Sequence, residues 1–241
     1  MTDEQKKVLE ELIANDEHPE RGKIKFVKDG PGFVYFERLT LNHWERWHKS
    51  GHLSCRANYK DGKLDGLFES WYENGQLYCR RNYENGKEEG LDEEWYQNGQ
   101  LAARTNYKNG EEEGLYEEWW ENGQLKLRGS YKNGNEVGTF EEWYDTGELF
   151  GRTFYCDGST HGTSTYWSRD GEILEMNNYK NGEKDGPQVS NIGLDFVTVS
   201  TYKDGSFQDL NSYHSIDEAM ASLAQKKKIT LKPKKKGGVK L

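Results

Sequence analysis

The chain repeats itself at a fixed step of 24 residues over more than half of its length. Four kinds of position recur in one phase: two are glycines, one is tryptophan and one is tyrosine. The members are Gly66, Gly90, Gly114, Gly138, Gly162 and Gly186; Gly51, Gly75, Gly99, Gly123, Gly147 and Gly171; Trp47, Trp71, Trp95, Trp119, Trp143 and Trp167; and Tyr59, Tyr83, Tyr107, Tyr131, Tyr155 and Tyr179. Self-similarity at a fixed period predicts a repeat architecture, in which each unit buries its apolar groups against its neighbours.

Each repeat carries two turn signals. Asn74-Gly75 lies between two strand-prone segments, and Asn-Gly predicts a two-residue type I′ hairpin turn. A second turn is expected at Asn85-Gly86, within the recurring pattern Tyr-x-Asn/Asp-Gly. The chain is therefore expected to be all-β: a single-layer antiparallel meander of tandem 24-residue two-hairpin repeats, with short helices at the N- and C-terminal ends.

The first turn also fixes a strand register. A two-residue turn at Asn74-Gly75 places Glu69 opposite Arg80, and the same spacing recurs in four other hairpins. The predicted pairs are Glu45–Arg56, Glu69–Arg80, Glu93–Arg104, Glu117–Arg128 and Glu141–Arg152, while the sixth hairpin sets Thr165 against Met176. Each charged pair contributes about 0.2–1 kcal/mol, so the pairs specify the register more than they stabilise it.

The same register predicts a second set of pairs, on the other face of the sheet. These are Tyr72–Leu77, Tyr96–Leu101, Trp120–Leu125 and Tyr144–Leu149. Successive side chains of a strand point to opposite faces and the period is even, so each ladder stays on one face. We therefore expect the tryptophans to share a face with the Glu–Arg pairs.

The pattern Tyr-x-x-Gly-x-x-x-Gly-x-x-x-x-Trp-x-x-x-Gly resembles the MORN repeat in its bacterial variant form, over roughly residues 42–186. The resemblance implies a single-layer antiparallel sheet curled into a trough, and a scaffold role in which the repeats are not catalytic. Some bacterial members resemble antitoxins of toxin–antitoxin pairs. Some eukaryotic members are linkers on kinases, methyltransferases or membrane junctions, and none of those partner domains can be matched in this chain.

The pattern divides the chain into four parts. We predict an N-terminal cap (residues 1–41, helix plus hairpin), six repeats (42–186), closing strands with a capping helix (187–228) and a disordered Lys-rich tail (229–241). Residues 2–15 form an apolar stripe at helical spacing, with Val8, Leu9, Leu12 and Ile13. This helix is expected either to cap the open end of the sheet or to dock a partner.

Charge is unevenly distributed along the chain. The whole sequence has a net charge of −9, yet Lys226–Lys240 contains only basic charges, so the repeats are strongly acidic. An acidic surface argues against a nucleic-acid footprint on the sheet. The lysines could attach the chain nonspecifically to nucleic acid or anionic lipid, or serve only as a solubilising end.

The sequence offers little for catalysis, and we expect no catalytic, cofactor or metal site. Adjacent acids such as Glu93 and Glu94 point to opposite faces of the sheet, so they do not come together in one catalytic or metal site. His43, His48 and His52 are close in sequence, but the turn at Gly51 gives them poor ligand geometry. No phosphate-binding loop or nucleophile elbow is present.

The cysteine content and the N-terminal sequence indicate a cytoplasmic setting. Cys55 and Cys79 occupy equivalent positions two strands apart, too far for a disulfide. The N-terminus has no secretory signal, and no segment is apolar enough to span a membrane.

We predict a non-catalytic scaffold that binds a protein partner through an aromatic-rich sheet surface. Hydrophobic residues make up 33% of the chain and aromatic residues 13%, so the aromatics could equally serve only to hold a thin sheet together. The candidate partner-binding residues are Trp71, Tyr72, Trp95, Tyr96, Trp119, Trp120, Trp143 and Tyr144. The alternatives are an antitoxin-like neutraliser of a cognate toxin, and attachment to nucleic acid or anionic membrane through the tail.

Overall fold

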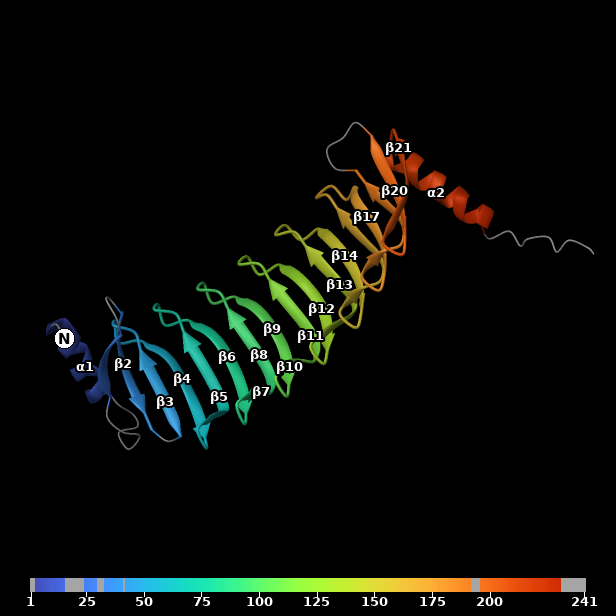
Figure 1. Cartoon of the computed structure of the whole chain (residues 1–241). Helices are drawn as coiled ribbons and strands as arrows, with labels where there is room; N and C mark the ends of the chain where they lie inside the picture. The colour runs from blue at the N-terminus through green and yellow to red at the C-terminus, as the bar shows by residue number, and fades with distance from the viewer. Residues whose placement is uncertain (1–2, 16–23, 30–32, 41, 192–195, 231–241) are drawn as a thin grey trace, which may run out of the picture. The chain divides into compact units, whose positions relative to one another are not determined.

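A computed structural model describes residues 3–15, 24–29, 33–40, 42–191 and 196–230. The chain forms two compact units, one made of residues 1–136 and 145–147 and the other of residues 137–144 and 148–241. Within each unit, successive long strands lie side by side and antiparallel (Figure 1), and each two-residue strand pairs with the same preceding strand as the long strand that follows it. The expected all-β meander of two-hairpin repeats, with a short helix near each end of the chain, is confirmed.

The first unit begins with a helix and continues with twelve described strands. Its elements are α1 (Asp3–Ala14), β1 (Lys25–Asp29), β2 (Phe33–Leu39), β3 (His43–Trp47), β4 (Leu53–Lys60), β5 (Lys63–Trp71), β6 (Leu77–Glu84), β7 (Lys87–Glu88), β8 (Gly90–Trp95), β9 (Leu101–Lys108), β10 (Glu111–Glu112), β11 (Gly114–Trp119) and β12 (Leu125–Lys132). β1 and β2 form the expected N-terminal hairpin, although Gly30 to Gly32 of its turn lie outside the described residues.

The second unit ends in a helix. Its elements are β13 (Asn135–Trp143), β14 (Leu149–Cys156), β15 (Ser159–Thr160), β16 (Gly162–Trp167), β17 (Ile173–Lys180), β18 (Glu183–Lys184), β19 (Gly186–Ser190), β20 (Val197–Lys203), β21 (Ser206–Tyr213) and α2 (Ile216–Thr230). The last three strands are the closing strands that the sequence predicts after the regular repeats. α2 continues two residues beyond the predicted end of the capping helix, and residues 231–241 of the predicted tail lie outside the described residues.

The first turn of each repeat differs from the prediction. Gly75 N donates to Tyr72 O and Tyr72 N to Gln76 O, both at 2.9 Å, so the loop has three residues rather than two. Gly75 alone takes a positive φ, of 84°. Asn74 stays out of the left-handed region because its side chain is used otherwise: its Oδ1 accepts from Gln76 N at 3.1 Å. The type I′ assignment at this turn is therefore wrong.

The second turn is the type I′ turn. Asn85 and Gly86 have φ values of 51° and 85°, and the flanking residues Glu84 and Lys87 are paired. Positive φ at both central residues defines this turn type and favours Asn-Gly. The two Asn-Gly sequences of one repeat thus have different conformations.

All five predicted Glu–Arg pairs are opposite one another in the observed register, as are Thr165 and Met176. A bulge beside the first turn absorbs the extra loop residue, so the register beyond it is unchanged. The second set of pairs is wrong, because the bulge places the tryptophan, not the next residue, opposite each leucine. In place of Tyr72–Leu77, Tyr96–Leu101, Trp120–Leu125 and Tyr144–Leu149, the observed partners are Trp71–Leu77, Trp95–Leu101, Trp119–Leu125 and Trp143–Leu149.

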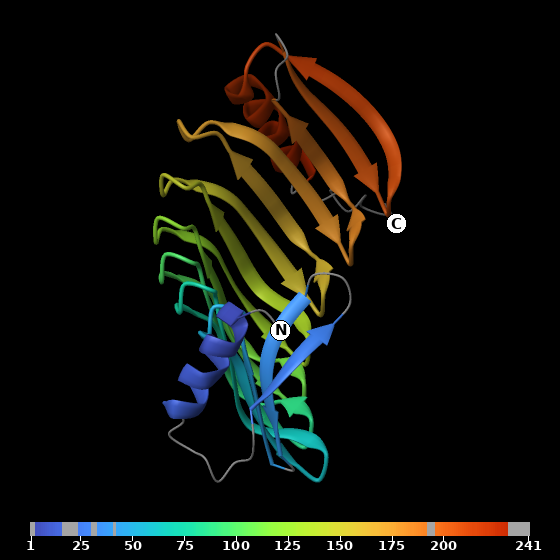
Figure 2. The ribbon, with the colours of Figure 1, turned by 90° about the vertical axis from the view of Figure 1, so that its left-hand side faces the viewer.

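Each helix packs on the face of nearby strands within its own unit (Figure 2). Val8, Leu9 and Leu12 of α1 contact a core that contains Phe36 and Trp47. Ile13 was expected in the same stripe but is 57% exposed. In the second unit the apolar side of α2 packs on a core of valines from β19 and β20, together with its own Ala219. The helices therefore supply the second apolar layer that a single sheet lacks.

Candidate functional site

Four strands of the first unit each end in a tryptophan on one face of the sheet. β3, β5, β8 and β11 end in Trp47, Trp71, Trp95 and Trp119. Residues two apart on a strand share a face, so each tryptophan lies beside the glutamate two residues before it. Trp47 is buried under α1, and the other three are half-buried. We call the surface that carries these four residues the tryptophan face.

A row of alternating charges runs along the tryptophan face. Arg56, Arg80 and Arg104 each lie opposite the glutamate of their own hairpin and also opposite the glutamate of the next repeat. In order across the strands the row is Arg38, Glu45, Arg56, Glu69, Arg80, Glu93, Arg104, Glu117 and Arg128. The sequence predicted the pairs inside hairpins. It missed those between repeats, because they depend on the second turn, whose loop length it did not fix.

The ion pairs within this row are uneven. Glu69 accepts a hydrogen bond from Arg56 Nε at 2.7 Å and from Arg80 Nε at 2.9 Å, and its side chain is only 3% exposed. Glu93 lies opposite Arg80 and Arg104, yet no ion pair to it is found in the described part of the chain. The buried carboxylate of Glu69 thus binds two arginines, whereas the carboxylate of Glu93, the next glutamate of the row, forms no ion pair among the described residues.

Glu117 repeats the arrangement of Glu69 two repeats further on. Arg104 Nη2 and Arg128 Nη2 each donate to it at 2.7 Å, and its side chain is 3% exposed. Burial acts to raise the pKa of Glu117, but the hydrogen bonds from both arginines outweigh it and hold the pKa below its ordinary value. The carboxylate is therefore charged at neutral pH and fixes the two guanidinium groups.

Three of the four arginines held in this way also lie over the tryptophan of the next repeat. The distance from guanidinium carbon to ring centroid is 5.4 Å for Arg56 over Trp71, 5.8 Å for Arg80 over Trp95 and 5.5 Å for Arg104 over Trp119. Such contacts contribute about 0.5–1 kcal/mol at exposed sites. About half of each arginine side chain remains exposed. The face therefore presents tryptophan rings and oriented guanidinium groups together.

The tyrosines that follow the tryptophans lie on the opposite face and join neighbouring repeats. Tyr72 Oη donates to Trp95 O at 2.9 Å, and Tyr96 Oη donates to Trp119 O at 2.7 Å. The ring of Tyr72 also packs edge-to-face on Tyr78, with centroids 5.2 Å apart. These hydroxyls are committed to backbone carbonyls of the next repeat, which makes the tyrosines structural links.

Of the remaining candidates on this face, Trp120 departs from the pattern and Tyr144 follows it. Trp120 has no hydroxyl, and the ammonium group of Lys126 lies 5.3 Å from its ring centroid. In the second unit, Tyr144 Oη donates to Trp167 O at 2.9 Å, and Trp143 is half-buried beside it. The six candidate residues of the first unit thus divide between two faces of its sheet and do not form one surface. Their role in binding a partner stays a prediction.

The three clustered histidines contact the peptide backbone or a neighbouring side chain. His43 Nδ1 lies 3.0 Å from Asn58 Oδ1, His48 Nε2 lies 3.1 Å from Trp71 O, and His52 Nδ1 lies 2.7 Å from Glu73 O. His48 occupies the repeat position of Tyr72 and makes the same link to the next repeat. Among the described residues, no group of three or more His, Cys, Asp or Glu side chains is placed to hold a metal ion.

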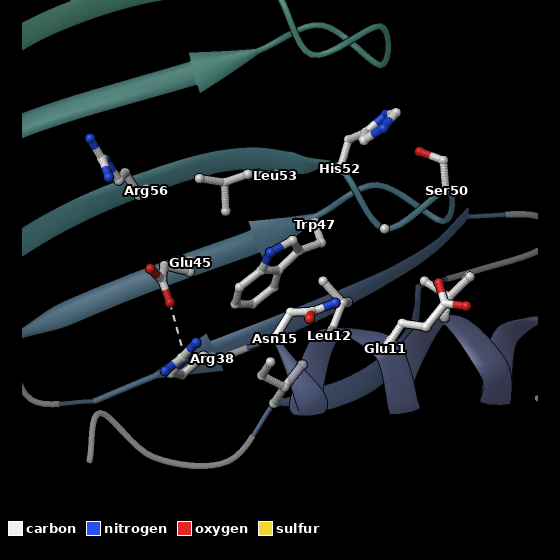
Figure 3. Close-up of a pocket in the computed structure, with 13 residues that line it drawn as sticks. Glu11, Leu12, Asn15, Arg38, Glu45, Trp47, Ser50, His52, Leu53 and Arg56 are labelled. Atoms are coloured by element: carbon white, nitrogen blue, oxygen red, sulfur yellow. Dashed lines mark ion pairs between the residues drawn. The ribbon is translucent and has the colours of Figure 1, made fainter. Parts of the chain in front are cut away.

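A pocket of about 520 Å³ lies between α1 and the tryptophan face (Figure 3). Leu12 of the helix and Trp47 of the sheet form apolar walls. Arg38 and Glu45, the first two members of the charged row, line it as an ion pair 3.0 Å apart. The pocket is thus the place where the row passes beneath the helix.

Sequence reasoning overlooked one position on the face opposite the tryptophans. Asp92 stands where neighbouring repeats have Phe68 and Tyr116, and it is buried beside Arg81. Burial is the largest influence on its carboxyl group and, although Arg81 opposes it, raises the pKa to about 6. Aligning the repeats at their period would have found it, since a lone aspartate breaks a run of aromatic residues.

Cys55 and Cys79 are buried free thiols, and burial raises the pKa of both.

No helix in the described part of the chain is long and apolar enough to cross a membrane.

Comparison with known proteins identifies the repeat. Residues 64–86, 88–109, 112–133 and 160–181 each match the family model of the MORN repeat variant. No curated protein matches the chain. Among solved structures, the crystal structure of a GtfA/B complex bound to UDP and GlcNAc matches at 16% identity, over 57% of this chain and 25% of that chain, with a TM-score of 0.22. A likeness this weak says nothing about fold or function. These four segments match the MORN repeat variant, and MORN repeats generally act as non-catalytic scaffolds for protein or membrane interaction.

Proposed function

We propose that this protein is a non-catalytic scaffold that binds a protein partner on the tryptophan face of its first unit. The main support is the combination of half-buried tryptophans with half-exposed arginines that Glu69 and Glu117 hold in place. Tryptophan and arginine are enriched among residues that dominate binding energy at protein interfaces. Fixing the arginines in advance lowers the entropy lost on binding.

Apolar surface beside the charged row favours the same face. Leu91 and Leu115 share it, because each lies four residues before a tryptophan on the same strand, and they are 40% and 43% exposed. The molecule already covers this face once, where α1 buries Trp47. The equivalent residues Trp71, Trp95 and Trp119 have no such cover in the described part of the chain.

A pair of surface variants tests the proposal. The double change Leu91→Asp with Leu115→Asp places charge on the tryptophan face with little effect on folding, since both side chains are well exposed. Tyr78→Asp is the control, because Tyr78 is 42% exposed on the opposite face. Partners captured from the native source by the wild-type chain should be lost by the double variant and kept by the control.

Three results would contradict the proposal. Capture that survives the double variant but fails with Tyr78→Asp would move the site to the other face. A captured toxin whose activity the chain suppresses would favour the antitoxin alternative, and capture by residues 226–241 alone would favour attachment through the tail.

A further inference from the structure

The face opposite the tryptophans carries a ladder of paired aromatic rings with one interruption. In three repeats, an aromatic ring on one strand packs edge-to-face on a tyrosine ring of the following strand. The ring centroids are 6.3 Å apart for Phe68 and Tyr83, 5.6 Å for Tyr116 and Tyr131, and 5.1 Å for Phe140 and Tyr155. Asp92 replaces the first ring in the repeat between Phe68 and Tyr116, and no ring contact to Tyr107 is found among the described residues.

The missing ring leaves a pocket of about 190 Å³ in the first unit. Asp92 and Tyr107 line it together with Arg81, Glu94, Thr105 and Tyr116. Register explains the grouping, because Asp92 is directly opposite Thr105, a small residue that leaves the space open. Small residues also stand at the equivalent positions Ala57, Gly129 and Thr153, so the pocket arises from one departure from the repeat pattern, Asp92 in place of an aromatic ring.

Two buried oxygen atoms in this pocket lack a hydrogen-bond partner. They are Asp92 Oδ1 and Thr105 Oγ1, on side chains that belong to residues only 8% and 6% exposed. A buried polar atom without a hydrogen-bond partner destabilises the folded state, so a ligand that supplies donors there is favoured. The carboxylate oxygen can only accept, and the hydroxyl can accept as well, so the complementary group is a donor.

The charge around these atoms calls for a cation. Arg81 is already engaged: its Nε lies 3.0 Å from Asp92 Oδ2, its Nη1 lies 3.8 Å from Glu88, and its Nη2 contacts Glu94. Three carboxylates thus share this guanidinium group, and Glu112 adds a further acidic side chain to the lining of the pocket. Arg104 lines the pocket too, but its guanidinium group is bound to Glu117 on the tryptophan face.

We propose that this pocket binds a primary ammonium group. One N–H donates to Asp92 Oδ1 and a second to Thr105 Oγ1, while the alkyl chain lies against the ring of Tyr107 and takes the place of the missing aromatic partner. A lysine side chain of a partner protein and a free alkylamine share this chemistry. The site is independent of the proposed function, because it lies on the opposite face of the sheet.

Titration of n-butylammonium chloride into the full chain at pH 8, followed by calorimetry, tests the proposal. We expect saturable binding that Asp92→Asn weakens by at least about tenfold, because the acceptor and its charge are both lost. Asp92→Phe restores the ring of the other repeats and should abolish binding. Thr105→Val keeps the charge and should weaken binding by several-fold.

Glu93→Gln is the matched control, since it removes one charge from the same strand on the other face. It should leave the affinity unchanged. Absence of saturable heat with the wild-type chain would mean that the pocket is only hydrated, and would overturn the proposal. Equal weakening by Glu93→Gln and Asp92→Asn would overturn it too, by showing only general attraction to an acidic sheet.

A pH series supplies a second readout. The charged and titratable groups near Asp92 are Tyr78, Cys79 and Arg81 on β6, Glu88 on β7, Glu94 on β8, Tyr107 on β9, Glu112 on β10 and Tyr116 on β11. Protonation of Asp92 near pH 6 should weaken ammonium binding in the wild-type chain between pH 8 and pH 5. Residual binding by Asp92→Asn should lack this step, and a step of equal size there would contradict the assignment.

The source of the ammonium group is decided by a second ligand. A blocked Gly-Lys-Gly peptide that binds more tightly than n-butylammonium would indicate a lysine of a partner protein. Tighter binding of the free amine would indicate a small molecule. Failure of both ligands would overturn the site without affecting the proposed tryptophan-face interface.

Discussion

Two buried carboxylates, Asp92 and Glu117, show how the neighbours of a side chain determine its pKa. Asp92 and Glu117 are both buried, but Glu117 receives hydrogen bonds from two arginines and Asp92 faces one arginine shared among several acids. The pKa therefore falls at Glu117 and rises at Asp92. Replacing each carboxyl group by an amide should therefore change the stability of the protein in opposite directions.

Replacing Asp92 by Asn should stabilise the protein at pH 8. The pKa of Asp92 is raised from 3.8 to about 6, so its favourable contribution is complete below pH 3.8 and is lost as the pH rises through 6. Asn resembles the neutral acid and avoids this loss of stability, which amounts to roughly 3 kcal/mol. Urea denaturation of both proteins should show a gain at pH 8 that shrinks towards pH 4. A gain independent of pH would exclude this carboxyl as its cause.

Replacing Glu117 by Gln should destabilise the protein by about 1–3 kcal/mol at pH 7, because Arg104 and Arg128 lose their shared partner. The contribution of Glu117 is present above its ordinary pKa of 4.5 and is lost as the pH falls below that value. Glu93→Gln at the equivalent position should change the unfolding free energy by less than about 0.5 kcal/mol. Equal effects of the two changes would show that the charged row is uniform.

At the scale of the hairpin, neighbouring repeats are joined by side chains that reach one strand further. Each tyrosine after a tryptophan donates to a backbone carbonyl of the next repeat, and each loop asparagine does the same nearby, as in Asn98 Nδ2 to Glu121 O at 2.9 Å. A single-layer sheet has no opposing sheet to hold its strands. These links supply part of that restraint.

Removing the hydroxyl of Tyr72 should cost about 1 kcal/mol, because the partly buried Trp95 O loses its donor. Tyr78→Phe is the control, since no hydrogen bond to its hydroxyl is found in the described part of the chain, and it should be neutral within a few tenths of a kcal/mol. Thermal denaturation of the Tyr72→Phe and Tyr78→Phe variants measures the difference. Identical melting temperatures would remove the tyrosine from the links between repeats.

At the scale of the molecule, the stability of a repeat array is approximately a sum over repeats and their contacts. Removal of one whole period keeps every ladder in phase. If residues 90–113 were excised, Arg80 would lie opposite Glu117 and Tyr72 would reach Trp119 O, the equivalents of their present partners. Removal of an odd number of residues reverses the faces of every downstream side chain.

The excision of 24 residues should therefore give a soluble, strand-rich protein of slightly lower stability. Excision of 23 residues, 90–112, should give a protein that aggregates or unfolds without cooperativity. Circular dichroism and size-exclusion chromatography distinguish the two outcomes. Similar behaviour of both proteins would contradict the 24-residue period as the structural unit.

The repeat period, the two turns and the Glu–Arg register could be read from the sequence because they depend on local rules. Asn-Gly marks a turn whatever surrounds it, and opposite charges at a fixed distance from the turn report the pairing. The register survived an error in loop length, since a bulge at Trp71 compensated for it. The tryptophan face followed from strand alternation alone.

Tertiary structure decided what depends on contacts between repeats. Asn74 avoids the type I′ turn because its amide bonds within the loop and to Gln97 O of the next repeat. Glu69 and Glu117 each take two arginines and leave Glu93 without one, which the identical local patterns do not foretell. The pocket at Asp92 likewise exists only because neighbouring strands bring Arg81 and Thr105 beside it. Sequence sets which residues share a face and a register, whereas the partner of each side chain depends on the three-dimensional competition among its neighbours.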